Sequence, residues 1–74
     1  MNLQQFYAKA LKRYFENSHE RYGQAHMNLL SEINPELARS VTNTPNDPFY
    51  SDLKMENFRK WLACVWEDVA DQED

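Results

Sequence analysis

The side chains of this 74-residue chain that are best suited to metal binding or nucleophilic catalysis are two histidines and one cysteine. His19 and His26 are seven residues apart, which on a helix separates their Cα atoms by about 10 Å along the axis. Two histidines of one helix bind the same ion when they are three or four residues apart. We therefore expect no metal site, and we predict that His26 is half-buried and hydrogen-bonded beside Tyr22 or Leu30. His19 is expected in a capping region or at the surface.

Cys64 lacks the surroundings of a catalytic nucleophile. The acidic residues Glu67 and Asp68 would raise the pKa of its thiol rather than lower it. A glycine-rich phosphate-binding loop is excluded because the chain has only one glycine. A single cysteine cannot form an internal disulfide and fits a reducing cytoplasm. We predict a partly exposed thiol with no chemical role, no cofactor, and a protein that is not an enzyme.

The charge balance argues against nucleic-acid binding as the main activity. Eight Lys and Arg face twelve Asp and Glu, for a net charge of −4, whereas nucleic-acid-binding proteins are usually basic. Positive charge is concentrated at Lys9, Lys12 and Arg13, and residues 67–74 carry five acids and no base. Two interpretations stay open. Either residues 71–74 are a frayed, solvated tail, or the acids reach the three basic residues within one chain or across a dimer.

Apolar residues at intervals of three and four predict three long helices that bury one face each. The first covers Asn2 to Glu16 with Asn2 as its N-cap, the second His19 to Ile33, and the last Ser51 or Asp52 to Ala70.

A short helix from Pro35 to Thr42 is predicted because Asn34 is a good N-cap and proline suits the first helical position. A loop follows at residues 42–47, and Phe49 and Tyr50 are expected to tuck under the domain. No segment alternates as a strand does. The fold class is therefore all-α, a small bundle of three main helices plus one short helix, in a single domain of residues 1–74. Neither a signal peptide nor a membrane span is expected.

The second helix is predicted to lie in the middle of the bundle. No residue between Tyr22 and Ser31 is charged, which indicates that more than one side of the helix is covered. Gly23 disfavours a helix interior by up to about 1 kcal/mol relative to alanine. We expect another backbone or side chain to approach it closely.

A protein-binding surface is predicted at Gly23, Gln24, Met27, Asn28 and Trp66. Gln24 and Asn28 are four residues apart on one side of the second helix, where their amides need partners if they are covered. They either bind a partner protein, or face solvent, or bond internally to residues 35–50. Trp66 is equally compatible with a core position and with an interface.

The stretch Arg21–Leu30, the sequence Asn34-Pro35-Glu36-Leu37-Ala38 and the sequence Asp47-Pro48-Phe49-Tyr50 stand in a characteristic order before the last helix. Over residues 21–61 this pattern resembles small uncharacterised bacteriophage and prophage proteins. The resemblance implies a bacterial or phage cytoplasmic setting, and it transfers no functional residue because no activity is known for that group.

Three functions follow as hypotheses. The first is a non-enzymatic protein-interaction module, such as a phage-encoded accessory protein or inhibitor that binds a host or phage protein. The second is a homo-oligomeric structural module whose two-fold interface is built by the final or the middle helix. The third is nucleic-acid association through Lys9, Lys12 and Arg13. Affinity for nucleic acid rises with the number of phosphates that are neutralised, and these three residues are few for that purpose.

Overall fold

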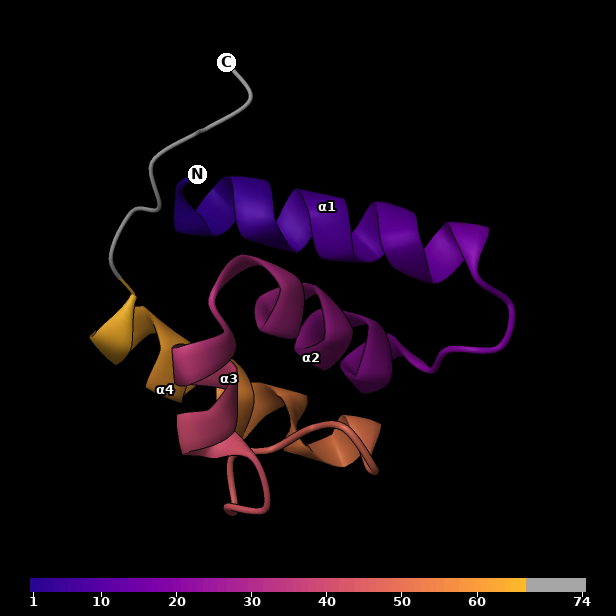
Figure 1. The fold of residues 1–74 in the computed structure, drawn as a ribbon. Helices are drawn as coiled ribbons and strands as arrows, with labels where there is room; N and C mark the ends of the chain where they lie inside the picture. The colour runs from indigo at the N-terminus through magenta and orange to yellow at the C-terminus, as the bar shows by residue number, and fades with distance from the viewer. Residues whose placement is uncertain (67–74) are drawn as a thin grey trace.

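The structure is a computed structural model that describes residues 1–66, and its regular elements are helices (Figure 1). They are α1 (Leu3–Glu16), α2 (Tyr22–Ile33), α3 (Pro35–Val41), a 3-10 turn η1 (Asp52–Lys54) and α4 (Met55–Val65). No strand occurs between residues 1 and 66. The predicted all-α bundle of three longer helices and one short helix is confirmed. In the described part of the chain, no helix combines the length and the hydropathy that crossing a bilayer requires.

Two of the helices begin at the residues that local capping predicts. The side chain of Asn2 accepts a hydrogen bond from the backbone N–H of Gln5, and the side chain of Gln5 accepts one from Asn2, both at 2.8 Å. This reciprocal capping box satisfies two N–H groups that have no partner within the helix. The side chain of Asn34 caps α3 by accepting a hydrogen bond from the N–H of Leu37, at 3.2 Å, without a reciprocal bond.

The second helix begins at Tyr22 and not at His19, so that prediction is wrong. α1 ends when both the backbone and the side-chain nitrogen of Asn17 bind the carbonyl of Arg13, at 3.0 and 3.1 Å. Residues 17–21 then turn the chain back toward α2, and within them Glu20 is held by the Arg13 guanidinium. These residues are used for the reversal and cannot continue a helix.

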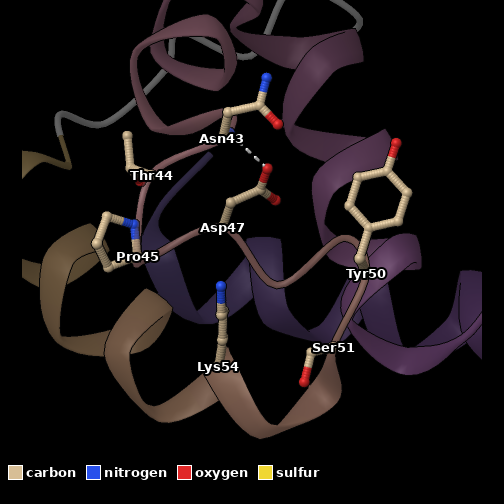
Figure 2. A pocket seen from close by; sticks show the side chains of 7 residues that line it. All are labelled: Asn43, Thr44, Pro45, Asp47, Tyr50, Ser51 and Lys54. Carbon is tan, nitrogen blue, oxygen red and sulfur yellow. Dashed lines mark hydrogen bonds between the residues drawn. The ribbon is translucent and has the colours of Figure 1, made fainter.

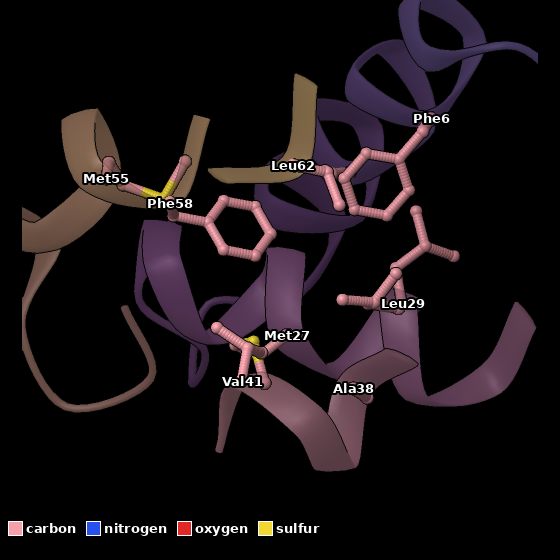
Figure 3. Packing of buried hydrophobic residues seen from close by; sticks show 10 residues of the cluster. Phe6, Met27, Leu29, Ala38, Val41, Met55, Phe58 and Leu62 are labelled. Carbon is pink, nitrogen blue, oxygen red and sulfur yellow. The ribbon is translucent and has the colours of Figure 1, made fainter. Parts of the chain in front are cut away.

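The core lies around α2, which confirms the predicted central position of this helix. α2 packs against α1 on one side and α3 on another, and η1 covers its first turn (Figure 1). The buried cluster draws on all four α-helices (Figure 3). Its members are Phe6, Ala10, Met27, Leu29, Leu30, Ala38, Val41, Met55, Phe58 and Leu62.

The last helix is shorter than predicted. α4 ends at Val65, because Trp66 has an extended backbone (φ −67°, ψ 133°) instead of continuing toward Ala70. The indole of Trp66 lies against Phe6, with the ring centroids 5.3 Å apart. This contact attaches the end of α4 to α1. The predicted acidic tail lies outside the described residues.

Candidate functional site

The five residues of the predicted binding surface differ in their exposure. Gly23 and Met27 are buried, and Met27 lines a hollow that is described below. Gln24, Asn28 and Trp66 are partly exposed. Loop residues 47–49 and the helices cover the side of α2 on which Gly23 and Met27 lie. That these five residues bind a partner stays a prediction.

Gly23 is the point at which the loop after α3 meets α2. A Cβ atom built on Gly23 would lie 2.2 Å from the carbonyl oxygen of Pro48, so only glycine allows this approach. The N–H of Gly23 also donates to Oδ1 of Asp52 at 2.7 Å. The predicted close approach to Gly23 is confirmed, and it fastens the segment from Pro48 to Asp52 onto α2.

Next to this contact, the loop leaves two adjoining hollows on the surface. The smaller one, of about 250 Å³, lies between α2 and the loop and is lined by Met27, Asn28, Ser31, Thr42, Asn43, Asp47, Phe49 and Tyr50. The larger one, of about 420 Å³, is lined by Asn43, Thr44, Pro45, Asp47, Tyr50, Ser51 and Lys54 (Figure 2). The hollows share Asn43, Asp47 and Tyr50, and we call them together the loop groove.

Asp47 holds the walls of the loop groove in place. Its side chain is buried, and its Oδ2 accepts from the N–H of Asn43 at 2.8 Å (Figure 2). Its Oδ1 accepts from the N–H of Phe49 at 2.9 Å. Asn43 has a positive φ of 64°, a conformation that asparagine tolerates better than most residues. Both oxygens of the carboxylate are therefore used to hold the loop, and neither is left to bind a ligand.

Tyr50 stands out at the rim of the loop groove. Its side chain is 78% exposed, whereas Phe49 is partly buried against the core, so the prediction that both residues tuck under the domain is wrong for Tyr50. The N–H of Ser51 and the carbonyl of Pro48 close a turn around both residues. The rings still touch edge to face, with centroids 4.8 Å apart, and this contact positions Tyr50.

Several polar groups of the loop groove are free to bind something else. The side-chain amide of Asn43, the hydroxyl of Tyr50 and the ammonium of Lys54 make no hydrogen bond to another residue between 1 and 66. An asparagine amide carries both donors and an acceptor, so it can pair with a peptide unit. Together with the exposed ring, these groups suit a polypeptide segment as ligand.

His26 is a core residue. It is 1% exposed, and its Nδ1 lies 2.8 Å from the carbonyl oxygen of Tyr22, so Nδ1 carries the proton. Burial lowers its pKa below the ordinary value. The predicted hydrogen bond beside Tyr22 is confirmed, but the side chain is fully buried rather than half-buried. His19 and Cys64 are both exposed. Between residues 1 and 66, no three His, Cys, Asp or Glu side chains are grouped to hold a metal ion.

An ionic cluster between α1 and α2 was not foreseen from the sequence. Arg13 binds the carboxylate of Glu20 through two nitrogens, at 3.0 and 3.2 Å, and that of Glu32 at 2.7 Å. Asn28 donates to Glu20 at 2.7 Å, so its amide does bond internally, although not to residues 35–50. The hydrogen bonds from Arg13 lower the pKa of Glu20. With Arg13 engaged, the predicted basic face retains Lys9 and Lys12, both exposed.

Trp66 packs on the core and is partly buried. Beyond its contact with Phe6, its Nε1 is buried without a hydrogen-bond partner in the described part of the chain. Trp61 is also partly buried, with its ring 6.0 Å from that of Phe58. Both tryptophans therefore contribute to the packing of α4.

Comparison with protein-family models, curated proteins and solved structures gives no match for this chain. The resemblance to small phage proteins, and the bacterial cytoplasmic setting that it implies, stay predictions.

Proposed function

We propose that the protein is a non-enzymatic interaction module that binds an extended segment of another protein in the loop groove. The observation that carries this proposal is the exposed ring of Tyr50 standing between two hollows. Asn43, whose side-chain amide has no hydrogen-bond partner among residues 1–66, lines both hollows as well. Concave sites with a few convergent polar groups are the usual binding sites of proteins.

The rigidity of the groove supports the proposal. Its walls are tied by the two hydrogen bonds to Asp47, by the contact of Pro48 with Gly23, and by the Arg21 guanidinium on the carbonyl oxygen of Phe49. A surface that is already ordered loses little conformational entropy on binding, which improves affinity.

The chemistry of the groove indicates what kind of segment it takes. Asn43 is suited to pair with a backbone amide, and the Tyr50 ring offers an amphipathic contact of the kind that dominates many interfaces. Lys54 lines the larger hollow and would favour a carboxylate on the ligand. We therefore expect an extended segment with an apolar and an acidic side chain. The phage resemblance favours a host or phage protein as its source.

A peptide-display selection on the intact protein tests this proposal. Enriched peptides are measured by titration against the wild type and against two variants, Tyr50→Ser and Asn43→Gly. We expect each variant to weaken binding about tenfold or more, which corresponds to about 1.4 kcal/mol. Glycine is chosen at position 43 because it removes the amide and still accepts the positive φ.

Leu53→Ser is the matched control, because Leu53 is 94% exposed and lines neither hollow. It should leave the affinity unchanged. Peptides that bind the Tyr50→Ser variant as tightly as the wild type would show that the loop groove is not the binding site, and a selection that enriches nothing would count equally against the proposal.

A further inference from the structure

A second exposed apolar surface lies on α1, away from the loop groove. Leu11, Tyr14 and Phe15 are 42%, 36% and 75% exposed, although all three are large apolar or aromatic residues. Leu11 and Phe15 are one helical turn apart, and Tyr14 lies beside them. α1 lies along the outside of the molecule, and its opposite side is buried on α2 through Phe6 and Ala10 (Figure 1). We call the three exposed residues the α1 face.

The aromatic rings of the α1 face are held in position by neighbours. The Tyr14 ring lies 5.5 Å from the ring of Phe15, and also 5.5 Å from that of Tyr22, which it meets at 86°. Tyr22 is in turn fixed by the hydrogen bond from Arg59 to its hydroxyl, at 2.6 Å. The face is thus an ordered surface on a rigid helix.

Two opposite charges flank the α1 face. Lys12 and Glu16 are both exposed and four residues apart, yet no ion pair joins them or ties either to another described residue. A lysine that precedes a glutamate by four residues is the weaker order for an intrahelical pair. Glu16 also ends α1, where an acidic side chain opposes the helix dipole. Neither charge is therefore explained by the stability of its own helix.

We propose that a second copy of this chain covers the α1 face, with the two α1 helices antiparallel about a two-fold axis near Tyr14. In this arrangement the Tyr14 rings of the two copies are neighbours, and Phe15 of each copy lies near Leu11 of the other. Lys12 of each copy faces Glu16 of the other, so one charge pair is formed twice. A self-complementary pattern of this kind identifies a second copy as the occupant.

The size of the face sets the strength of the association. One helix face buries less than the roughly 1,600 Å² of a standard stable interface. We therefore expect a weak dimer whose population depends on protein concentration. The dimer uses no residue of the loop groove, so its failure and the failure of the proposed peptide binding are independent results.

Sedimentation equilibrium over a concentration series tests the dimer through two charge reversals. In Lys12→Glu, positions 12 and 16 are both acidic, and in Glu16→Lys both are basic, so each variant alone should stay near the chain mass of 8.9 kDa. An equimolar mixture of the two variants brings acidic positions against basic ones. We expect the mixture to recover the average mass of the wild type, approaching twice the chain mass.

A pair of matched substitutions tests the apolar contact. Phe15→Glu should abolish association, whereas Leu53→Glu, which introduces the same charge at a more exposed apolar residue outside the α1 face, should not. Circular dichroism establishes that both variants are folded. A wild type that remains monomeric at the highest soluble concentration would overturn the proposal. So would a dimer that persists in Phe15→Glu, or a mixture of the charge reversals that stays monomeric.

Discussion

Gly23 shows how one residue can join two distant segments. Helix propensity alone predicts that Gly23→Ala stabilises α2 by up to about 1 kcal/mol. The Cβ would however lie 2.2 Å from the Pro48 oxygen and 3.0 Å from its carbonyl carbon, which are backbone atoms that cannot rotate away. We therefore expect Gly23→Ala to lower the free energy of unfolding by about 1–3 kcal/mol, as overpacking does. Urea denaturation measures this change.

The exposed Ser31 on the same helix provides the comparison. Ser31→Ala should change stability only by the few tenths of a kcal/mol that helix propensity predicts. If Gly23→Ala proved as stable as Ser31→Ala, the loop would not be held against α2 as described.

The buried imidazole of His26 predicts a pH dependence of stability. Because burial lowers the pKa of His26 in the folded state, the unfolded chain binds more protons than the folded one as pH falls below about 6.5. The contribution of neutral His26 to the free energy of unfolding is fully present above pH 6.5. It is lost as the pH falls toward the pKa that His26 has in the folded state. The slope approaches at most about 1.4 kcal/mol per pH unit. Urea denaturation between about pH 5 and pH 8 measures it.

His26→Phe should remove this slope, because phenylalanine keeps an aromatic ring in the core and has no group that titrates at position 26. The exposed His19 offers a control variant, His19→Gln, which should retain the slope of the wild type. Equal slopes for the wild type and His26→Phe would refute the assignment of the pH dependence to His26.

At the scale of elements, α2 depends on a cap that comes from another segment. Its N-cap residue, Arg21, provides no side-chain cap. Instead, the N–H of Gly23 donates at 2.7 Å to the carboxylate of Asp52, which is 29 residues after Gly23 in the chain. A carboxylate at a helix N-terminus satisfies a free donor and complements the dipole. We expect Asp52→Ala to destabilise the protein by about 0.5–2 kcal/mol, measured by urea denaturation.

Hydrogen exchange separates this role of Asp52 from a general effect. The first turn of α2 should lose protection in Asp52→Ala, whereas the first turn of α1, which has its own capping box at Asn2, should keep it. An equal loss of protection from hydrogen exchange in the first turns of α1 and α2 would contradict a capping role for Asp52.

At the scale of the whole molecule, one small core carries the fold. A chain of this length has a free energy of unfolding of roughly 4–11 kcal/mol. Phe58 is fully buried in the cluster that unites the four α-helices, and truncating a buried phenylalanine to alanine costs about 3–5 kcal/mol. Phe58→Ala should therefore remove a large part of the free energy of unfolding and lower the midpoint of the thermal transition well below that of the wild type. Leu53→Ala, at an exposed position, should melt like the wild type. Near-ultraviolet circular dichroism follows both.

The sequence by itself determined the elements that depend on near neighbours. The caps at Asn2 and Asn34, and the apolar spacing along each helix, act over three or four residues, and α1 and α3 begin as they predict. The uncharged stretch of α2 correctly indicated a helix covered on more than one side, and Gly23 indicated a close approach. The last helix was predicted to run past Trp66, but it ends at Val65, where the Trp66 backbone is extended and its ring packs on Phe6, far away in the chain.

Only the tertiary structure decided the loop groove, the ionic cluster of Arg13 and the exposure of Tyr50 and Phe15. Each depends on which distant segments meet: Arg13 with Glu32, Gly23 with Pro48, and Asp52 with the start of α2. Residue types and spacing report the period of a helix but not the partner that its side chains find. The sequence therefore indicated that Asn28 needs a partner, and the packing of the chain decided that this partner is Glu20.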